Sequence, residues 1–378
     1  MPPMDHTMLR ERIAVARDAI YMNTGWAGPS PSGVLDRVHQ ALTREAGLGP
    51  ASPDGIAFHR ALLREAREAA ARLLRAGVDD VFLTHGTTEG VNIVLHGLDW
   101  RPGDELVTCD LEHPALADAA ALLAERRGVV VRTASMPPDA TPRHAVDAVR
   151  QALTPRTRVV ALSHVQYSSG LRLPAREIAD TTHAAGALVL YDGAQTGGHL
   201  ALDMAAIGAD AYAVSGQKWL LGPTGTGALF MNPRIRSAVR PLLDRAAEGD
   251  HAYTLASHGA PLLAGFAEAI RIHEALGPAA VEARALLLGA RLKGLLGAIP
   301  GARLTGPVDA AASCGLVTIA IDGWPPPAAV DRLWRSHRIA ARAVRNPDAV
   351  RFSTAPFNTE AECEAVAAAV RELATTAP

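Results

Sequence analysis

Short runs of strand-forming residues alternate with helical segments from about residue 55 to residue 230. We expect seven strands here, at residues 81–84, 105–109, 129–133, 158–163, 187–191, 211–214 and 227–231. Several are continuously apolar, for example Val-Val-Ala-Leu at 159–162, as is typical of strands that helices cover on both faces. The alternation therefore predicts an α/β domain with a mostly parallel seven-stranded sheet between helices.

The order of elements changes after about residue 240. Before a closing helix, we expect two long helices at residues 261–276 and 279–298, a strand at 316–321, a further βα element, and a strand at 350–353. Thr359, with Glu362 three residues later, has the spacing of a capping box at the start of the closing helix. We predict a large domain at residues 15–245 and a smaller α+β domain at 246–378, with residues 1–30 packing near the smaller one.

Composition and charge limit the partners that can be expected. The 378 residues are 48% hydrophobic and carry a net charge of -2, which gives no electrostatic reason to expect nucleic acid or an acidic membrane as a partner. No apolar run approaches the roughly 20 residues that span a bilayer, and residues 1–17 lack the apolar stretch of a signal peptide, so we expect a cytoplasmic protein. The cysteines Cys109, Cys314 and Cys363 and the 14 histidines have no metal-site or disulfide spacing, so no metal is expected.

Three loops that follow predicted strands contain residues suited to ligand binding, because ligands of open α/β sheets bind beyond the carboxyl ends of the strands. Thr87 and Thr88 follow Gly86 at a predicted helix start, where backbone N–H groups and hydroxyls can donate to an anion. A threonine-capped helix without a ligand is the alternative. Asp192 follows a buried strand and could be a cap, a metal ligand or a cofactor contact. Lys218 lies in a turn of small residues, where desolvation would lower its pKa as Schiff-base chemistry requires.

One cofactor, pyridoxal 5′-phosphate (PLP), accounts for all three loops. Its phosphate, ring nitrogen and aldehyde each need a partner from the protein. Asp192 would keep the ring nitrogen protonated, and Lys218 would bind the aldehyde as a Schiff base. The sequence therefore predicts a PLP enzyme with a small amino-acid substrate.

Five short motifs resemble those of a known family. They are Gly-Thr-Thr-Glu-Gly-Val-Asn at 86–92, Glu-His-Pro at 112–114, Ser-His-Val at 163–165, Asp-Gly-Ala-Gln at 192–195 and Ser-Gly-Gln-Lys at 215–218. In this order they resemble the class V enzymes of PLP-dependent transferase fold type I, which include cysteine desulfurases, cyst(e)ine C–S lyases and isopenicillin N epimerase-like proteins. The resemblance extends from residue 21 to the C-terminal helix. It implies that fold and a homodimer with active sites near the subunit interface.

The resemblance also implies which residues bind the cofactor, namely Thr87, Thr88, His113, Asp192, Gln195, Ser215, Gln217 and Lys218. Thr87, Thr88 and Ser215 would hold the phosphate. His113 would stack on the ring, with a purely structural histidine as the alternative, and Gln195 would hydrogen-bond the phenolic oxygen. Lys218, His113 and Asp192 are the expected catalytic residues, with Lys218 moving protons at the substrate's Cα as general acid and base.

Four further residues are expected near the substrate. Arg351 matches the arginine that binds the substrate carboxylate by a bidentate pair, with a surface or structural arginine as the alternative. The segment 21–29 resembles the entry loop of the lyase and epimerase branch, which places Asn23 and Trp26 near the substrate. Trp26 could shape the pocket or fill a gap. Tyr167 stands where this branch often has an aromatic residue, and a half-buried strand-end tyrosine is the alternative.

The sequence departs from the desulfurase pattern at three places. The segment 339–347, where desulfurases carry a nucleophilic cysteine, has none. Gln217 replaces the usual histidine and cannot titrate near neutral pH. Ala260 replaces a threonine that reaches the phosphate of the neighbouring subunit. We therefore expect a C–S lyase that converts cystine, cysteine or a cysteine S-conjugate by β-elimination to pyruvate, ammonia and a thiol or persulfide. A class V aminotransferase, an amino-acid epimerase with His113 or Tyr167 as second acid/base, and a non-catalytic PLP-binding protein remain alternatives.

Overall fold

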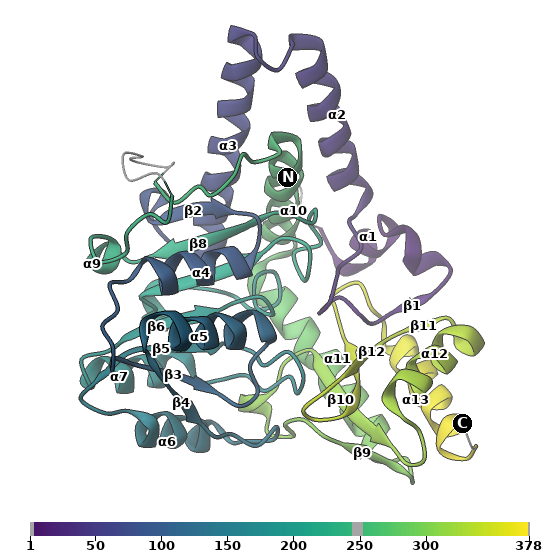
Figure 1. The fold of residues 1–378 in the computed structure, drawn as a ribbon. Coiled ribbons are helices and arrows are strands. Elements are labelled where there is room, and N and C mark those ends of the chain that lie inside the picture. The colour runs from purple at the N-terminus through teal and green to yellow at the C-terminus, as the bar shows by residue number, and fades with distance from the viewer. Residues whose placement is uncertain (1–3, 244–251, 377–378) are drawn as a thin grey trace.

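The computed structural model describes residues 4–243 and 252–376. Its larger sheet has seven strands in the order β2-β8-β7-β6-β5-β3-β4 (Figure 1). These strands are β2 (Val81–Thr84), β3 (Glu105–Cys109), β4 (Val130–Ala134), β5 (Thr157–Ser163), β6 (Leu188–Asp192), β7 (Ala211–Ser215) and β8 (Gly227–Met231). In this sheet β8 runs opposite to the other six strands, which are parallel to one another, and this confirms the predicted mostly parallel sheet. Each predicted strand end agrees to within one residue.

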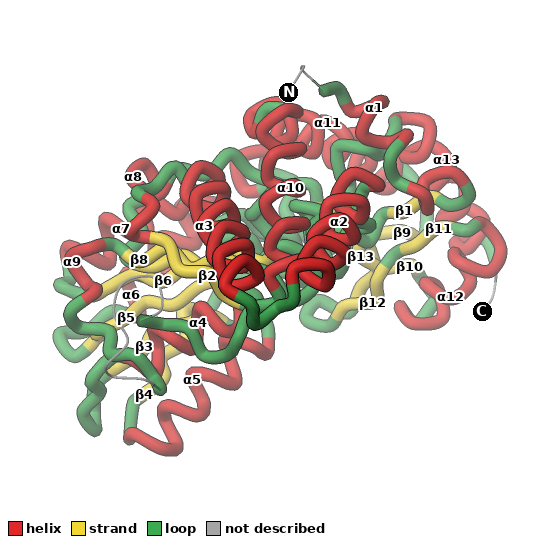
Figure 2. Tube along the Cα trace, turned by 90° about the horizontal axis from the view of Figure 1, so that it is seen from above, coloured by secondary structure: helices red, strands yellow, loops and turns green. Residues whose placement is uncertain are grey.

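Helices cover both faces of the large sheet (Figure 2). One face packs on α3 (Pro53–Leu74), α6 (Pro142–Ala152), α7 (Ala175–Ala184), the short α8 (Met204–Ile207) and α10 (Ala260–Leu276). The other face packs on α4 (Thr87–Gly97), α5 (Pro114–Arg127) and the short α9 (Pro233–Arg236). In β5, Val160 and Leu162 belong to the first core and Val159 and Ala161 to the second. Because successive side chains of a strand point to opposite faces, a strand buried on both sides is continuously apolar.

A second sheet is antiparallel, with the order β12-β13-β10-β9. Its strands are β9 (Ala302–Leu304), β10 (Leu316–Ile321), β12 (Arg342–Val344) and β13 (Ala349–Ser353). They share a separate core with α11 (Pro278–Gly297), α12 (Pro326–His337) and α13 (Glu360–Ala374). The hydroxyl of Thr359 accepts from the backbone N–H of Glu362, whose carboxylate accepts from the backbone N–H of Thr359. The predicted capping box of α13 is thus confirmed.

The N-terminal segment packs against the part of the chain that forms the second sheet. After α1 (His6–Glu11), β1 (Ile20–Tyr21) pairs in parallel with β11 (Ile339–Ala340), and Met22 lies in the core of the second sheet. The helices α2 (Ser32–Leu48) and α3 then form a long hairpin that projects from the body of the molecule (Figure 1). The division into residues 15–245 and 246–378 stays a prediction, because its boundary lies outside the described residues.

No helix in residues 4–243 and 252–376 is long and apolar enough to cross a membrane. Over the same two ranges, no group of three or more His, Cys, Asp or Glu side chains could hold a metal ion. All three cysteines are buried and free.

Candidate active site

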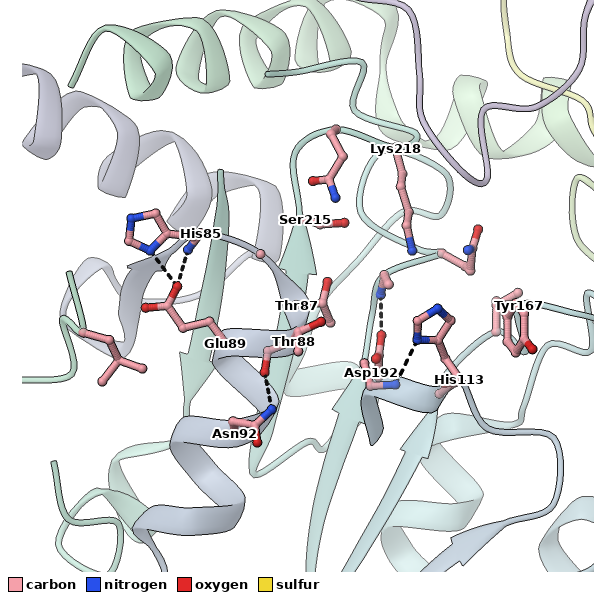
Figure 3. A pocket seen from close by; sticks show the side chains of 18 residues that line it. His85, Thr87, Thr88, Glu89, Asn92, His113, Tyr167, Asp192, Ser215 and Lys218 are labelled. Carbon is pink, nitrogen blue, oxygen red and sulfur yellow. Dashed lines mark hydrogen bonds and ion pairs between the residues drawn. The ribbon is translucent and has the colours of Figure 1, made fainter. Parts of the chain in front are cut away.

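A cavity of about 460 Å³ lies at the carboxyl ends of β5, β6 and β7 (Figure 3). The predicted site residues that line it are Thr87, Thr88, His113, Tyr167, Asp192, Gln195, Ser215, Gln217 and Lys218. They come from loops far apart in the sequence, which meet because the carboxyl ends of parallel strands share one edge of the sheet. Asn23, Trp26 and Arg351 are not among the lining residues.

The cavity contains a buried lysine and a buried aspartate. Figure 3 shows Lys218 extending toward Asp192, the last residue of β6. Burial lowers the pKa of Lys218 to about 8, against the opposing effect of the Asp192 charge. Burial also raises the pKa of Asp192, whose Oδ1 accepts from the backbone N–H of Ala194 at 2.8 Å. Near pH 8 a large fraction of the lysine amine is therefore neutral and nucleophilic.

The turn that carries Lys218 is held against the N-terminal segment. The backbone N–H of Gly28 donates to the carbonyl of Gln217 at 2.7 Å. A Cβ atom on Gly28 would lie 2.2 Å from the Lys218 carbonyl oxygen, so only glycine allows this close approach. The entry segment thus helps to define the backbone position of Lys218.

Polar groups without partners gather at the end of the cavity formed by the start of α4. Gly86 is the N-cap of this helix, and no side chain caps it, so the alternative of a threonine-capped helix does not hold. The hydroxyls of Thr87 and Ser215, which can donate, are buried without a hydrogen-bond partner in the described residues. Buried polar groups are normally hydrogen-bonded, and a helix N-terminus favours anions. This end of the cavity is suited to a phosphate.

His113 forms one wall of the cavity as the N-cap of α5. Its Nδ1 accepts from the backbone N–H of Ala115 at 3.1 Å. Burial and then the charges of Lys218, Arg342 and Arg351 lower its pKa to about 4, so the ring is neutral at pH 7. The ring meets Tyr167 edge to face, with 4.9 Å between the centroids. Stacking of His113 on a cofactor ring stays a prediction.

The predicted substrate arginine lies behind the wall of the cavity. Arg351 in β13 is fully buried, and its Nη1 donates to the carbonyl of Tyr167 at 2.6 Å. Its Nε and Nη2 have no partner in the described residues. Burial and the nearby charge of Arg342 lower the pKa of Arg351 to about 9. A buried guanidinium with unused donors is suited to an anionic ligand.

The two predicted residues of the entry segment have different surroundings. Asn23 is buried, and its Oδ1 has no partner in the described part of the chain. Trp26 is 57% exposed and therefore does not fill a gap in the core. Its ring stacks on the guanidinium of Arg342, with 4.6 Å from Cζ to the ring centroid. Trp26 thus covers a second arginine close to Arg351.

Three residues that line the cavity were given no role from the sequence. His85, Glu89 and Asn92 line the cavity, and His85 Nδ1 lies 2.7 Å from Glu89 Oε2. Positions 85, 89 and 92 follow helical spacing, a signal that could have grouped them. Arg342 lies directly across from Arg351 in the antiparallel pair of β12 and β13. No feature of the sequence gives this pairing.

Comparison with known proteins shows the family of this chain. Isopenicillin N epimerase of Streptomyces clavuligerus is 30% identical over 400 aligned positions, and the alignment covers 99% of each chain. The cystine C–S lyase C-DES, solved with its product cysteine persulfide, is 27% identical, with a TM-score of 0.88 over 96% of this chain and 98% of that one. A C-DES mutant with glycine covalently linked to its PLP cofactor is 26% identical, with a TM-score of 0.89 over 96% and 99%. The sequence model of the aminotransferase class-V family matches residues 27–366, so the chain belongs to this family.

Proposed function

We propose that this protein is a PLP-dependent C–S lyase that performs β-elimination on cystine, cysteine or a cysteine S-conjugate. The observation that carries the proposal is the buried Lys218 amine facing Asp192, in a cavity whose other end has unpartnered hydroxyls. The likeness to the cystine lyase C-DES over 96% of the chain supports the choice of reaction. With cystine, one water is consumed, and the products are pyruvate, ammonia and cysteine persulfide.

The side chains of the cavity match the groups of PLP. Thr87, Thr88, Ser215 and Gln217 would hold the phosphate at the start of α4. The hydroxyls of Thr87 and Ser215 are buried there without a partner in the described residues and can donate. Asp192 would pair with the ring nitrogen, His113 would stack on the ring, and Gln195 would donate to the phenolic oxygen. Lys218 would bind the aldehyde carbon through its neutral amine.

The chain's own residues would then direct the elimination. When bound, PLP supplies an electron sink for the pair left at Cα. The amine of Lys218 would remove the Cα proton, and the sulfur on Cβ would leave with the electrons of the C–S bond. Asp192, which is buried, would pair with the protonated ring nitrogen, because opposite charges attract each other more strongly in a buried site than in water. Arg351 would orient the substrate through its carboxylate.

Two neighbouring arginines favour a substrate with two carboxylates. Arg351 and Arg342 are cross-strand partners, and like charges in such positions repel each other. Among the described residues, neither forms an ion pair with an acidic side chain. A substrate with a second carboxylate would relieve the repulsion. Cystine has this property, whereas cysteine does not.

The cysteines argue against a desulfurase that forms a persulfide on its own thiol. Cys109, Cys314 and Cys363 are all buried, and burial raises the pKa of each. The thiolate is the nucleophile, so thiols with raised pKa react poorly. None of the three lines the cavity. The sulfur would therefore leave on the product.

Product analysis tests the proposed reaction. PLP-loaded protein is mixed with L-cystine and several cysteine S-conjugates, without a keto acid, and pyruvate and ammonia are measured. We expect both to form in equal amounts over many turnovers. A single-turnover conversion to pyridoxamine phosphate without pyruvate would instead identify an aminotransferase.

A second candidate is an amino-acid epimerase. Its support is the pair of His113 and Tyr167, which meet edge to face at 4.9 Å beside Lys218, together with the epimerase relative that matches 99% of the chain. A second acid/base there could return a proton to the opposite side of Cα. The same incubation in D₂O separates the two functions: an epimerase would exchange the Cα proton and invert the amino acid without releasing pyruvate.

The rate of PLP capture should depend on the protonation of Lys218. Because burial lowers its pKa to about 8, we expect capture by the apoprotein to accelerate as pH rises and to level off above about 8. The Asp192 charge raises this pKa, so Asp192→Asn should shift the midpoint to lower pH. Stopped-flow absorbance measures both. A midpoint near 10 in the unchanged protein would contradict the assignment of a desolvated lysine.

We further propose that two copies associate through the hairpin of α2 and α3. Leu35 and Leu42, seven residues apart on α2, are 58% and 50% exposed, and Ile56 at the start of α3 is 43% exposed. Apolar side chains gathered on a projecting element are typical of a protein interface. Sedimentation should give twice the 39.6 kDa of one chain.

A further inference from the structure

The side-chain amide of Gln195 is fixed in one orientation. Its Oε1 accepts from the indole N–H of Trp219 at 2.9 Å, and its Nε2 donates to the carbonyl of Gly25 at 2.8 Å. An indole N–H can only donate, and a carbonyl can only accept. Turning the amide over would therefore place two donors together at one end and two acceptors together at the other.

Trp219 is itself held rigidly. It is buried and stacks on His199, with 3.8 Å between the ring centroids and 10° between the planes. His199 Nε2 accepts from the backbone N–H of Gly315 at 2.9 Å, so its hydrogen is on Nδ1, which donates to the Gln195 carbonyl at 2.9 Å. Burial lowers the pKa of His199 to about 4, which keeps this neutral form at physiological pH. The indole and Gln195 therefore belong to one ordered unit.

The same unit extends to the strand of the predicted substrate arginine. The backbone N–H of Gly25 donates to Ser353 Oγ at 3.1 Å, and Ser353 lies two residues after Arg351 in β13. A Cβ atom on Gly25 would lie 3.0 Å from both Gln195 Oε1 and Ser353 Oγ. The backbone of the entry segment thus passes Gln195 with little room to move.

We infer that Trp219 is a positioning residue that directs the amide nitrogen of Gln195 toward the phenolic oxygen of the cofactor. This inference rests on the proposed function. Gln195 lines the cavity and Trp219 does not, so the tryptophan acts only through the glutamine. Gly25 uses one of the two hydrogens on Gln195 Nε2. The second hydrogen is available to an anionic phenolic oxygen.

Loss of the indole N–H should change the titration of the bound cofactor. A hydrogen bond to the charged form of a group favours that form. The donor on Gln195 therefore favours the anionic phenolic oxygen and keeps the pKa of the bound cofactor, measured by its absorbance, low. In Trp219→Phe, Gln195 Oε1 would be buried without its donor, and the amide would no longer be held on that side. We expect the midpoint of the absorbance titration to rise by about half a pH unit or more.

The matched control is Trp100→Phe. Trp100 is also buried, and its indole N–H donates to the Leu95 carbonyl at 2.6 Å, in the core on the α4 side of the sheet. This variant should keep the midpoint of the unchanged protein. Gln195→Leu should raise the midpoint, and Trp219→Phe combined with Gln195→Leu should raise it no further. This non-additivity is expected when the indole acts only through the glutamine.

Two outcomes have distinct meanings. A normal midpoint in Trp219→Phe, with a raised one in Gln195→Leu, would overturn the inference and leave the proposed function intact. Failure of the unchanged protein to form a borohydride-reducible link at Lys218 would instead overturn the proposed function. If Trp219→Phe does not fold, indole ¹⁵N NMR of the unchanged protein replaces it: PLP loading and Gln195→Leu should each shift the Trp219 signal, and no shift in either would contradict the inference.

Discussion

Lys218→Ala is expected to abolish the borohydride-reducible link between PLP and the protein and to lower turnover by at least about 100-fold. Lys218 is the only lysine that lines the cavity, and burial already lowers its pKa to about 8. An alanine removes both the amine that binds the aldehyde and the base that moves the Cα proton. Reduction with borohydride followed by peptide mapping measures the link, and the pyruvate assay measures turnover.

The chain provides an unusually sharp control for this experiment. It contains only one other lysine, Lys293 in α11. Burial also lowers the pKa of Lys293, but its Nζ donates to the carbonyl of Pro307 and to Ser313 Oγ, away from the cavity. Lys293→Ala should therefore retain the reducible link. A link that survives in Lys218→Ala and disappears in Lys293→Ala would show that PLP binds to Lys293 instead.

The residues at strand ends could be predicted because their positions follow from local sequence. Asp192 ends β6, and Lys218 follows β7 by three residues. An apolar run identifies each strand, and a parallel sheet brings the carboxyl ends of its strands together. Fold and pocket were predicted to this extent without knowledge of any long-range contact.

Contacts between distant segments could not be predicted in this way. The Trp219 indole meets an amide 24 positions earlier, and Arg342 faces Arg351 only through the register of β12 and β13. The sequence placed Arg351 at the substrate but gave no sign that it lies fully buried behind Tyr167. These arrangements depend on how the N-terminal segment and the second sheet pack around the cavity, which no local pattern encodes.

Arg351→Gln is expected to raise KM for α-amino acids by roughly ten- to hundredfold, because it removes a charge-assisted hydrogen bond of about 1.5–3 kcal/mol. Glutamine can still donate to the Tyr167 carbonyl, which limits damage to the fold. Steady-state kinetics measure the effect. Spectral titration with an amine that lacks the carboxylate should show unchanged binding, which separates loss of carboxylate recognition from general damage to the site.

Arg342→Gln distinguishes the two arginines. Arg342 stacks on Trp26 and lies across from Arg351, so it would contact a second carboxylate rather than the one at Cα. We expect its loss to raise KM for cystine more than KM for a neutral S-conjugate, whereas Arg351→Gln should affect both. The Arg351 charge also lowers the pKa of Lys218, so Arg351→Gln should move the midpoint of PLP capture to higher pH. If Arg351→Gln changed neither KM nor this midpoint while Arg342→Gln raised KM for every substrate, the α-carboxylate would bind at Arg342, and Arg351 would be a structural arginine.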